Sequence, residues 1–186
     1  MKTYFSFHKE HFNNNGDQGN IEVLRLFLEK QGETLVESEN LDADFVLFGD
    51  ASRAALEHYE TELSSLVDGL QQRMTDGKPT LLVGSSYEYF WPLLSGVPFQ
   101  QAERSSEFRA VSSELGPIQG YRNSTIVDSD LALDRGFIGT TLFGPILAIN
   151  PQLLNLVLEE LNLVAADWSE RDAALVQKVR NDFIDG

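Results

Sequence analysis

Short apolar runs alternate along the chain with stretches in which apolar residues recur at helical spacing. The alternating segment Tyr4–Phe7 predicts a strand, and the apolar positions between Ile21 and Leu28 predict a helix. Phe45–Phe48 and Thr80–Val83 are continuous apolar runs, which is typical of strands buried on both faces. Between these two runs, apolar residues from Leu56 to Met74 fall on one face of a single long helix. This order of strands and helices predicts an α/β layered fold with a mostly parallel central sheet.

The second half of the chain carries different patterns. Pro92 is expected to interrupt the aromatic stretch Tyr87–Trp91 early, because proline breaks helices. Phe108–Val111 and Ser124–Val127 have polar partners and predict a pair of antiparallel strands. Pro151 follows Asn150, a good N-cap residue, and opens a leucine-rich helix. We expect the 186 residues to form one domain.

Charge and composition exclude several classes of function. Asp and Glu number 29 against 14 Lys and Arg, a formal net charge of −15 that disfavours nucleic acid and anionic membranes as partners. Cysteine is absent, which removes disulfides, thiolate metal sites and cysteine nucleophiles. No apolar stretch is long enough to span a membrane, and no signal peptide is recognisable, so we expect a cytoplasmic protein.

Two loops stand where parallel strands should end, and ligands of such sheets bind at the carboxyl ends of the strands. One loop is Gly49-Asp50 and the other is Gly84-Ser85-Ser86. A third, Asn13–Asn20, contains two glycines and is either a ligand-binding loop or a polar turn in which Asp17 caps the next helix.

The sharp strand-to-helix turn expected at Gly84 has the pattern of a nucleophile elbow. Ser85 or Ser86 could act there as a nucleophile if His8 or His11 reached it as a base, while the simpler interpretation is a turn whose serines cap a helix. The two histidines are three residues apart, but surface positions are favoured over a metal site, and no cofactor or metal is expected.

Five segments follow one another between about residue 11 and residue 164: NNNGDQGNIEVL, DADFVLFGD, GKPTLLVGSSYEYF, GYRNS and IGTTLFGPILAINPQLLNLVL. In this order they resemble motifs of the GatD-type glutamine amidotransferases of the cobyric acid synthase type. The last segment is the most specific, and the family has Gly-Thr-Tyr-Leu-His-Gly-Pro there. The third resembles the elbow segment of the family, which ends in Cys-Gly-Gly-Tyr-Gln.

The resemblance implies a flavodoxin-like α/β sandwich of the class I glutamine amidotransferase kind. In the family, a thiolate at the elbow attacks the glutamine side-chain amide, a histidine acts as base, and ammonia passes to a synthetase partner. For GatD-type proteins that partner is a Mur-ligase-like subunit that amidates a peptidoglycan precursor. The resemblance therefore implies a Mur-ligase-like or other synthetase partner.

This chain departs from the family at the reacting groups. When the elbow segments are aligned, Gly84 takes the place of the cysteine. When the last segments are aligned, Phe143 takes the place of the histidine, whereas the pattern of residues alone predicts that Phe143 packs between that strand and the C-terminal helix. Neither side chain can attack an amide or accept a proton.

The leading hypothesis is therefore a glutamine amidotransferase-like protein without glutaminase activity that binds a synthetase partner or a small ligand in the old cleft. The alternatives are a serine-dependent hydrolase or amidase, and an acidic protein-interaction module. The candidate cleft residues are Asn15, Asp17, Asn20, Gly49, Asp50, Ser85, Ser86, Tyr87 and Asn123.

Overall fold

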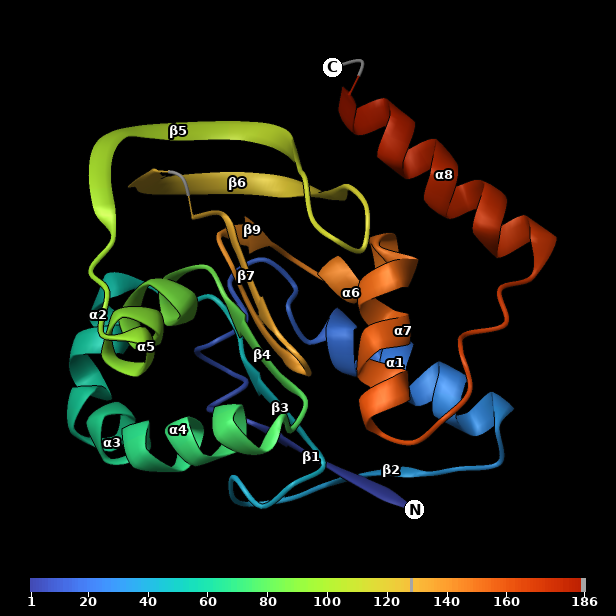
Figure 1. The fold of residues 1–186 in the computed structure, drawn as a ribbon, viewed down its shortest axis with the longest axis horizontal. Coiled ribbons are helices and arrows are strands. Elements are labelled where there is room, and N and C mark those ends of the chain that lie inside the picture. The colour runs from blue at the N-terminus through green and yellow to red at the C-terminus, as the bar shows by residue number, and fades with distance from the viewer. Residues whose placement is uncertain (128, 185–186) are drawn as a thin grey trace.

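The computed structural model describes residues 1–127 and 129–184 and contains two β-sheets with helices around the larger one (Figure 1). Its elements follow one another in the order β1 (Lys2–Ser6), α1 (Gly19–Lys30), β2 (Leu35–Glu37), β3 (Phe45–Phe48), α2 (Arg53–His58), α3 (Glu60–Ser65), α4 (Val67–Asp76), β4 (Thr80–Val83), α5 (Ser85–Ser95), β5 (Gln100–Val111), β6 (Ile118–Val127), β7 (Leu131–Asp134), β8 (Phe137–Thr140), β9 (Leu142–Phe143), α6 (Ile146–Ile149), α7 (Pro151–Glu160) and α8 (Glu170–Ile184).

The larger sheet has six strands in the order β2-β1-β3-β4-β8-β7. Every neighbouring pair is parallel except β7 and β8, which run antiparallel. The fold is therefore α/β with a mostly parallel central sheet, consistent with a flavodoxin-like sandwich, as predicted. The chain reverses its direction of winding between β1 and β3, which is where such sheets open a crevice.

Helices cover both faces of this sheet, and Figure 1 shows α1, α6 and α7 on one side and α2 to α5 on the other. The side chains of β3 alternate between the two faces of the sheet, so this strand contributes to the core on both sides. Phe45 and Leu47 enter the core beneath α1 and α7, whereas Val46 and Phe48 enter the core beneath α4 and α5. Burial on both faces explains the continuous apolar runs in the sequence.

The single long helix predicted over Leu56–Met74 is wrong. Three short helices, α2, α3 and α4, occupy this stretch, with breaks at Tyr59 and Leu66. Leu63 and Leu70 still face the core, because the breaks leave the helical spacing between the buried positions unchanged. The Tyr59 ring packs between the Phe12 ring and the imidazole of His8, and these contacts hold the chain at the first break.

The prediction that Pro92 ends the aromatic segment early is also wrong. Helix α5 continues through Pro92 to Ser95 and stops at Gly96, which adopts a left-handed conformation. Leu94 is buried in the last turn, so packing against the core compensates for the one backbone hydrogen bond that proline cannot donate.

The second sheet has three antiparallel strands in the order β5-β6-β9 and lies across the end of the larger sheet (Figure 1). The predicted antiparallel pair is confirmed, but both strands are longer than expected, and Phe108 pairs with Tyr121. Arg122 and Asp130 anchor this sheet through a buried ion pair of 2.5 Å.

Helix α7 begins as the sequence indicates, with Pro151 in its first turn. Asn150 does not cap that helix with its side chain. Its Oδ1 accepts a hydrogen bond from the backbone of Gln119 instead, which ties α7 to β6. None of the helices described is both long enough and apolar enough to cross a lipid bilayer.

Candidate functional site

The turn between β4 and α5 has the backbone of a nucleophile elbow without a nucleophile. Gly84 adopts φ 56° and ψ −122°, a conformation that side-chain-bearing residues rarely adopt. A Cβ at this position would lie 2.5 Å from Oδ1 of Asp50 and closer still to Cε1 of Phe143. The space into which an elbow side chain would project is therefore closed by a carboxylate and an aromatic ring.

Side chains of the protein also engage the backbone amides around the elbow. The Ser85 N–H donates to Oδ1 of Asp50 at 2.9 Å, and the Ala51 N–H donates to Oγ of Ser85 at 2.8 Å. In hydrolases built on such an elbow, the amide that follows the nucleophile stabilises the oxyanion. Here that amide already has an acceptor, and the Ser85 hydroxyl donates to the Ala51 carbonyl at 3.0 Å.

The loop after β1 holds the other side of the Asp50 carboxylate. The side-chain amides of Asn14 and Asn15 donate to Oδ2 of Asp50 at 3.2 and 3.0 Å. Three donors thus fix this carboxylate between the ends of β1, β3 and β4, which is the crevice expected from the strand order.

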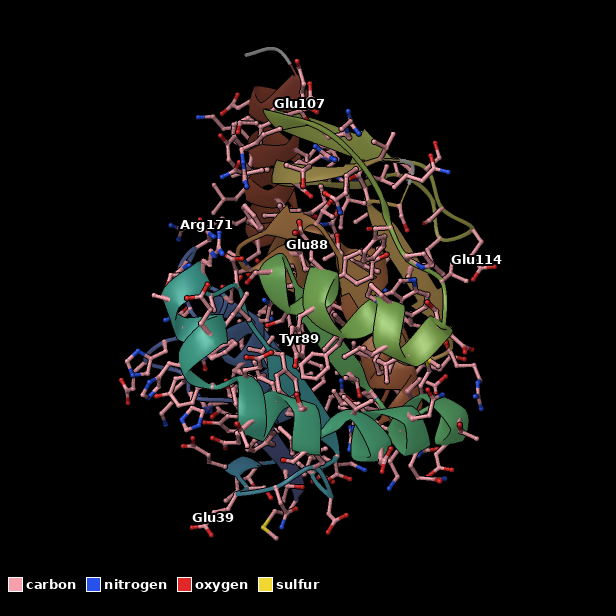
Figure 2. The ribbon with its side chains drawn as sticks, turned by 90° about the vertical axis from the view of Figure 1, so that its left-hand side faces the viewer. Glu39, Glu88, Tyr89, Glu107, Glu114 and Arg171 are labelled. Carbon is pink, nitrogen blue, oxygen red and sulfur yellow. The ribbon has the colours of Figure 1, made fainter. Side chains whose placement is uncertain are left out.

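A cavity of about 460 Å³ opens in front of the elbow, between the carboxyl ends of the parallel strands and the small sheet. Figure 2 shows Glu88 near the start of α5, in the space between that helix and the strands β5 and β6. We call this cavity the charged lobe. It is lined by Asn14, Asn15, Asp50, Ala51, Arg53, Leu56, Ser85, Glu88, Arg104, Tyr121, Asn123 and Phe143.

Two arginines and two carboxylates share the charged lobe. Arg53 of α2 pairs with Glu57 at 2.7 Å and leaves most of its side chain exposed. Arg104 of β5 donates to the backbone and side-chain oxygens of Asn123 at 3.2 and 3.0 Å. Burial raises the pKa of Glu88, although Ser124 donates a hydrogen bond of 2.5 Å to its carboxylate. Both signs of charge are therefore presented to one ligand-sized space.

Five of the predicted positions line this cavity, namely Asn15, Asp50, Ser85, Asn123 and Phe143, and Gly84 lies against the last of these. Phe143 packs against the core cluster that includes the buried residues of α7. Phe143 belongs to β9, pairs with Tyr121 of β6 and borders the elbow. Positions 84 and 143 therefore meet at one cleft.

Asp17 and Asn20 lie behind the cleft and do not line it. Asp17 accepts hydrogen bonds from the backbone N–H groups of Asp50 and Gly144 at 3.0 and 3.2 Å. Burial raises the pKa of Asp17 to about 6. Asn20 donates to the Gly144 carbonyl and accepts from the Leu147 N–H. The predicted helix cap is wrong, because the Asp17 carboxylate joins two loops and makes no capping bond to α1.

Three other predicted positions, Gly49, Ser86 and Tyr87, also lie in the protein interior. A Cβ on Gly49 would overlap the carbonyl oxygen of Phe12, and Ser86 donates to the Gly49 carbonyl at 2.6 Å. The Tyr87 hydroxyl bonds to Ser129, and its ring is fully buried. These three residues position the elbow and do not contact the cavity.

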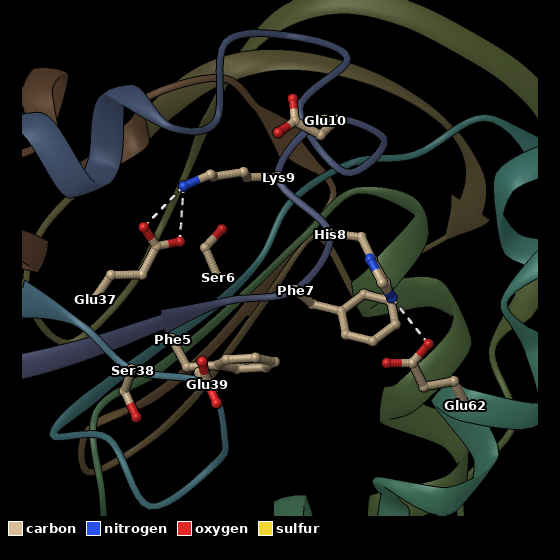
Figure 3. Close-up of a pocket in the computed structure, with 10 residues that line it drawn as sticks. All are labelled: Phe5, Ser6, Phe7, His8, Lys9, Glu10, Glu37, Ser38, Glu39 and Glu62. Carbon is tan, nitrogen blue, oxygen red and sulfur yellow. Dashed lines mark hydrogen bonds and ion pairs between the residues drawn. The ribbon is translucent and has the colours of Figure 1, made fainter.

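No histidine is among the residues that line the charged lobe in the described parts of the chain. His8 bonds to Glu62 at 2.9 Å and stacks on Tyr59, and His11 and His58 flank the same ring. His8 borders a different cavity, of about 590 Å³, at the ends of β1 and β2 (Figure 3). The geometry therefore gives no support to a Ser–His pair at the elbow.

Four of the ten residues that line the cavity beside His8 are glutamates. Lys9 reaches Glu37 with two distances of 2.8 Å, and Figure 3 shows Glu10 and Glu39 on the loops around them. No cluster of three or more potential metal ligands occurs among the described residues.

The charged and aromatic residues of the charged lobe that the sequence did not indicate are Arg53, Glu88, Arg104 and Tyr121. Tyr121 lies two residues before Asn123, so both side chains project from the same face of β6. That alternation was the available signal. The other three become neighbours only when α2, α5 and β5 are placed in space.

No protein-family model and no curated protein matches this sequence. Among solved structures, the crystal structure of SMU.1228c matches with a TM-score of 0.45 and 10% sequence identity. The match covers 78% of this chain and 70% of that one, and it bears on neither ligand nor activity.

Proposed function

We propose that the protein is a glutamine amidotransferase-like protein without glutaminase activity, whose elbow cleft binds a small zwitterion of the amino acid class. One observation carries the proposal: the elbow residue is Gly84, and the Phe143 ring occupies the space that a nucleophilic side chain would need. Loss of a nucleophile and its base together lowers rates on the order of a millionfold.

The environment of the elbow amides supports the absence of amide hydrolysis. An oxyanion that formed near Ser85 would compete with the Asp50 carboxylate for the same N–H group. Asp50 is buried and held by three donors, so it is not readily displaced. The same carboxylate repels a developing negative charge beside it.

The charges of the cleft support a zwitterionic ligand. Arg53 and Arg104 offer guanidinium groups to a carboxylate, and Glu88 offers a carboxylate to an ammonium group. A cavity of about 460 Å³ is within the range of small-molecule sites. The net charge of −15 repels carboxylates from most of the protein. The two arginines therefore provide the place in this cleft where the carboxylate of the ligand can bind.

Two measurements test the proposal. A coupled assay for ammonia should detect no release from L-glutamine above the buffer control. Isothermal titration with a panel of L-amino acids should detect binding that weakens at least tenfold when the α-amine is acetylated or the carboxylate is amidated. Arg104→Gln should weaken binding by about tenfold or more, whereas Arg171→Gln, on exposed α8, should not.

Ammonia release that disappears in Ser85→Ala would contradict the proposal and favour the serine-dependent alternative. Absence of binding by every amino acid would contradict the ligand class. The synthetase partner implied by the sequence resemblance stays a prediction, which co-purification from the native cell tests.

A further inference from the structure

Three aromatic side chains form a row across the small sheet. Phe108 in β5 pairs directly with Tyr121 in β6, and Tyr121 pairs directly with Phe143 in β9. Residues paired across strands project from the same face, so the three rings lie side by side on one surface. The rings of Phe108 and Tyr121 meet edge to face, with centroids 5.1 Å apart. We call these three residues the aromatic row.

The aromatic row forms one wall of a second hollow of about 270 Å³, which Pro145 and Ile149 close on the other side. We call this hollow the apolar lobe. It shares Asn15, Tyr121 and Phe143 with the charged lobe, so the two lobes are continuous. A ligand seated at the charged lobe can therefore extend into the apolar lobe without leaving the protein surface.

Phe108 and Tyr121 are partly exposed, at 46% and 37%. Tyr121 and Phe143 line both lobes, so an apolar group of a ligand in the charged lobe can lie against the aromatic row.

We infer that the cleft selects zwitterionic amino acids with a large apolar side chain, aromatic ones above all. This inference rests on the proposed function. The α-carboxylate binds Arg53 and Arg104, and the α-ammonium group faces Glu88. The ligand side chain then lies along the aromatic row in the apolar lobe.

Glutamine fits the same cleft poorly. Its side-chain amide would enter the apolar lobe, whose walls are aromatic and aliphatic apart from Asn15 and the Tyr121 hydroxyl. A buried amide without hydrogen-bond partners weakens binding, whereas a phenyl ring gains apolar and edge-to-face contacts. We therefore expect L-phenylalanine to bind about tenfold to a hundredfold more tightly than L-glutamine or L-alanine.

Isothermal titration with six probes tests the inference: L-phenylalanine, L-leucine, L-glutamine, L-alanine, 3-phenylpropionate and phenethylamine. L-phenylalanine should bind most tightly and L-leucine next. The last two probes each lack one charge of phenylalanine and should bind at least tenfold more weakly than it does.

Variants of the row separate the two lobes. Phe108→Ser should reduce the affinity for L-phenylalanine to near that for L-alanine, and it should weaken binding of L-phenylalanine far more than binding of L-alanine. Phe108→Leu, which keeps an apolar side chain in the strand, should give an intermediate affinity. Leu175→Ser removes a comparably exposed apolar side chain from α8 and should change neither affinity.

The outcomes distinguish failure of this inference from failure of the proposed function. Equal affinities for phenylalanine, glutamine and alanine would overturn the inference and leave the proposed function standing. Tight binding of phenethylamine or phenylpropionate would overturn the assignment of the charges. If no amino acid bound and Phe108→Ser changed the oligomeric state in light scattering, the row would be a protein contact, and the inference and the proposed ligand class would both fail.

Discussion

Gly84→Ala should destabilise the protein far more than an ordinary glycine substitution. The backbone at position 84, with φ 56° and ψ −122°, costs a side-chain-bearing residue about 1–3 kcal/mol. The new methyl group would also be only 2.5 Å from Oδ1 of Asp50 and even nearer the Phe143 ring. Overpacking of this kind costs about 1–3 kcal/mol more. The expected loss in the free energy of unfolding is therefore about 2–6 kcal/mol.

Part of that loss depends on the Phe143 ring, and a double-mutant cycle can isolate it. Phe143 is only partly buried, so Phe143→Ala alone should destabilise by about 1–3 kcal/mol, less than a fully buried ring. In Gly84→Ala/Phe143→Ala the clash with the ring is gone, while the backbone strain and the contact with Asp50 persist. The double variant should then be more stable than the sum of the single variants by about 0.5–2 kcal/mol.

Urea unfolding followed by circular dichroism measures all four corners of the cycle. Gly32→Ala is the matched control, because Gly32 also has a positive φ, of 75°, but a methyl group at that position would have no atom within 4 Å. It reports the effect of a left-handed backbone without crowding. The reasoning would be refuted if Gly84→Ala cost no more than Gly32→Ala, or if the two substitutions were additive to within about 0.3 kcal/mol.

Three further predictions concern buried charges. Burial raises the pKa of Asp17 from 3.8 to about 6, so its contribution to stability is fully present below about pH 4 and is lost as the pH rises through 6. Urea unfolding from pH 4 to 7 should show this loss, on the order of 3 kcal/mol, in the wild type but not in Asp17→Asn. Arg122→Leu removes the buried cationic partner of Asp130 and leaves the half-exposed Arg109 paired with this carboxylate, so it should destabilise by about 1–3 kcal/mol in urea. Arg73→Leu should cost at least about 3 kcal/mol in the same assay, because the buried guanidinium donates to four backbone carbonyls.

The central sheet was predictable because strands that are buried on both faces have continuous apolar runs in the sequence. Phe45–Phe48 and Thr80–Val83 are strands at the predicted positions. The helical region between them was not predicted correctly, since periodicity reports which face is buried and not whether the helix is continuous. Leu63 and Leu70 keep the same phase across a break, so the pattern of three short helices is that of one long helix.

The site was predictable where it depends on strand ends. Asp50 and Ser85 follow adjacent parallel strands, and the rule that such ends share an edge brings them together. Arg104 and Glu88 become neighbours only because the small sheet folds over that edge, and no local pattern reports such a placement. Asp17 was misassigned for a related reason: its polar loop is typical of a helix cap, but its carboxylate serves two distant loops.

Phe143 connects the closed elbow with the open cleft. One edge of its ring excludes a side chain at Gly84, while the same residue lines both the charged lobe and the apolar lobe. On the inference drawn above, the ring that leaves no room for a nucleophile is also a surface on which the ligand side chain rests. A small polar side chain at position 143 would remove the ring that crowds Gly84 and at the same time interrupt the aromatic row. On the same inference, amide hydrolysis and selection of an apolar side chain therefore place competing demands on this one position.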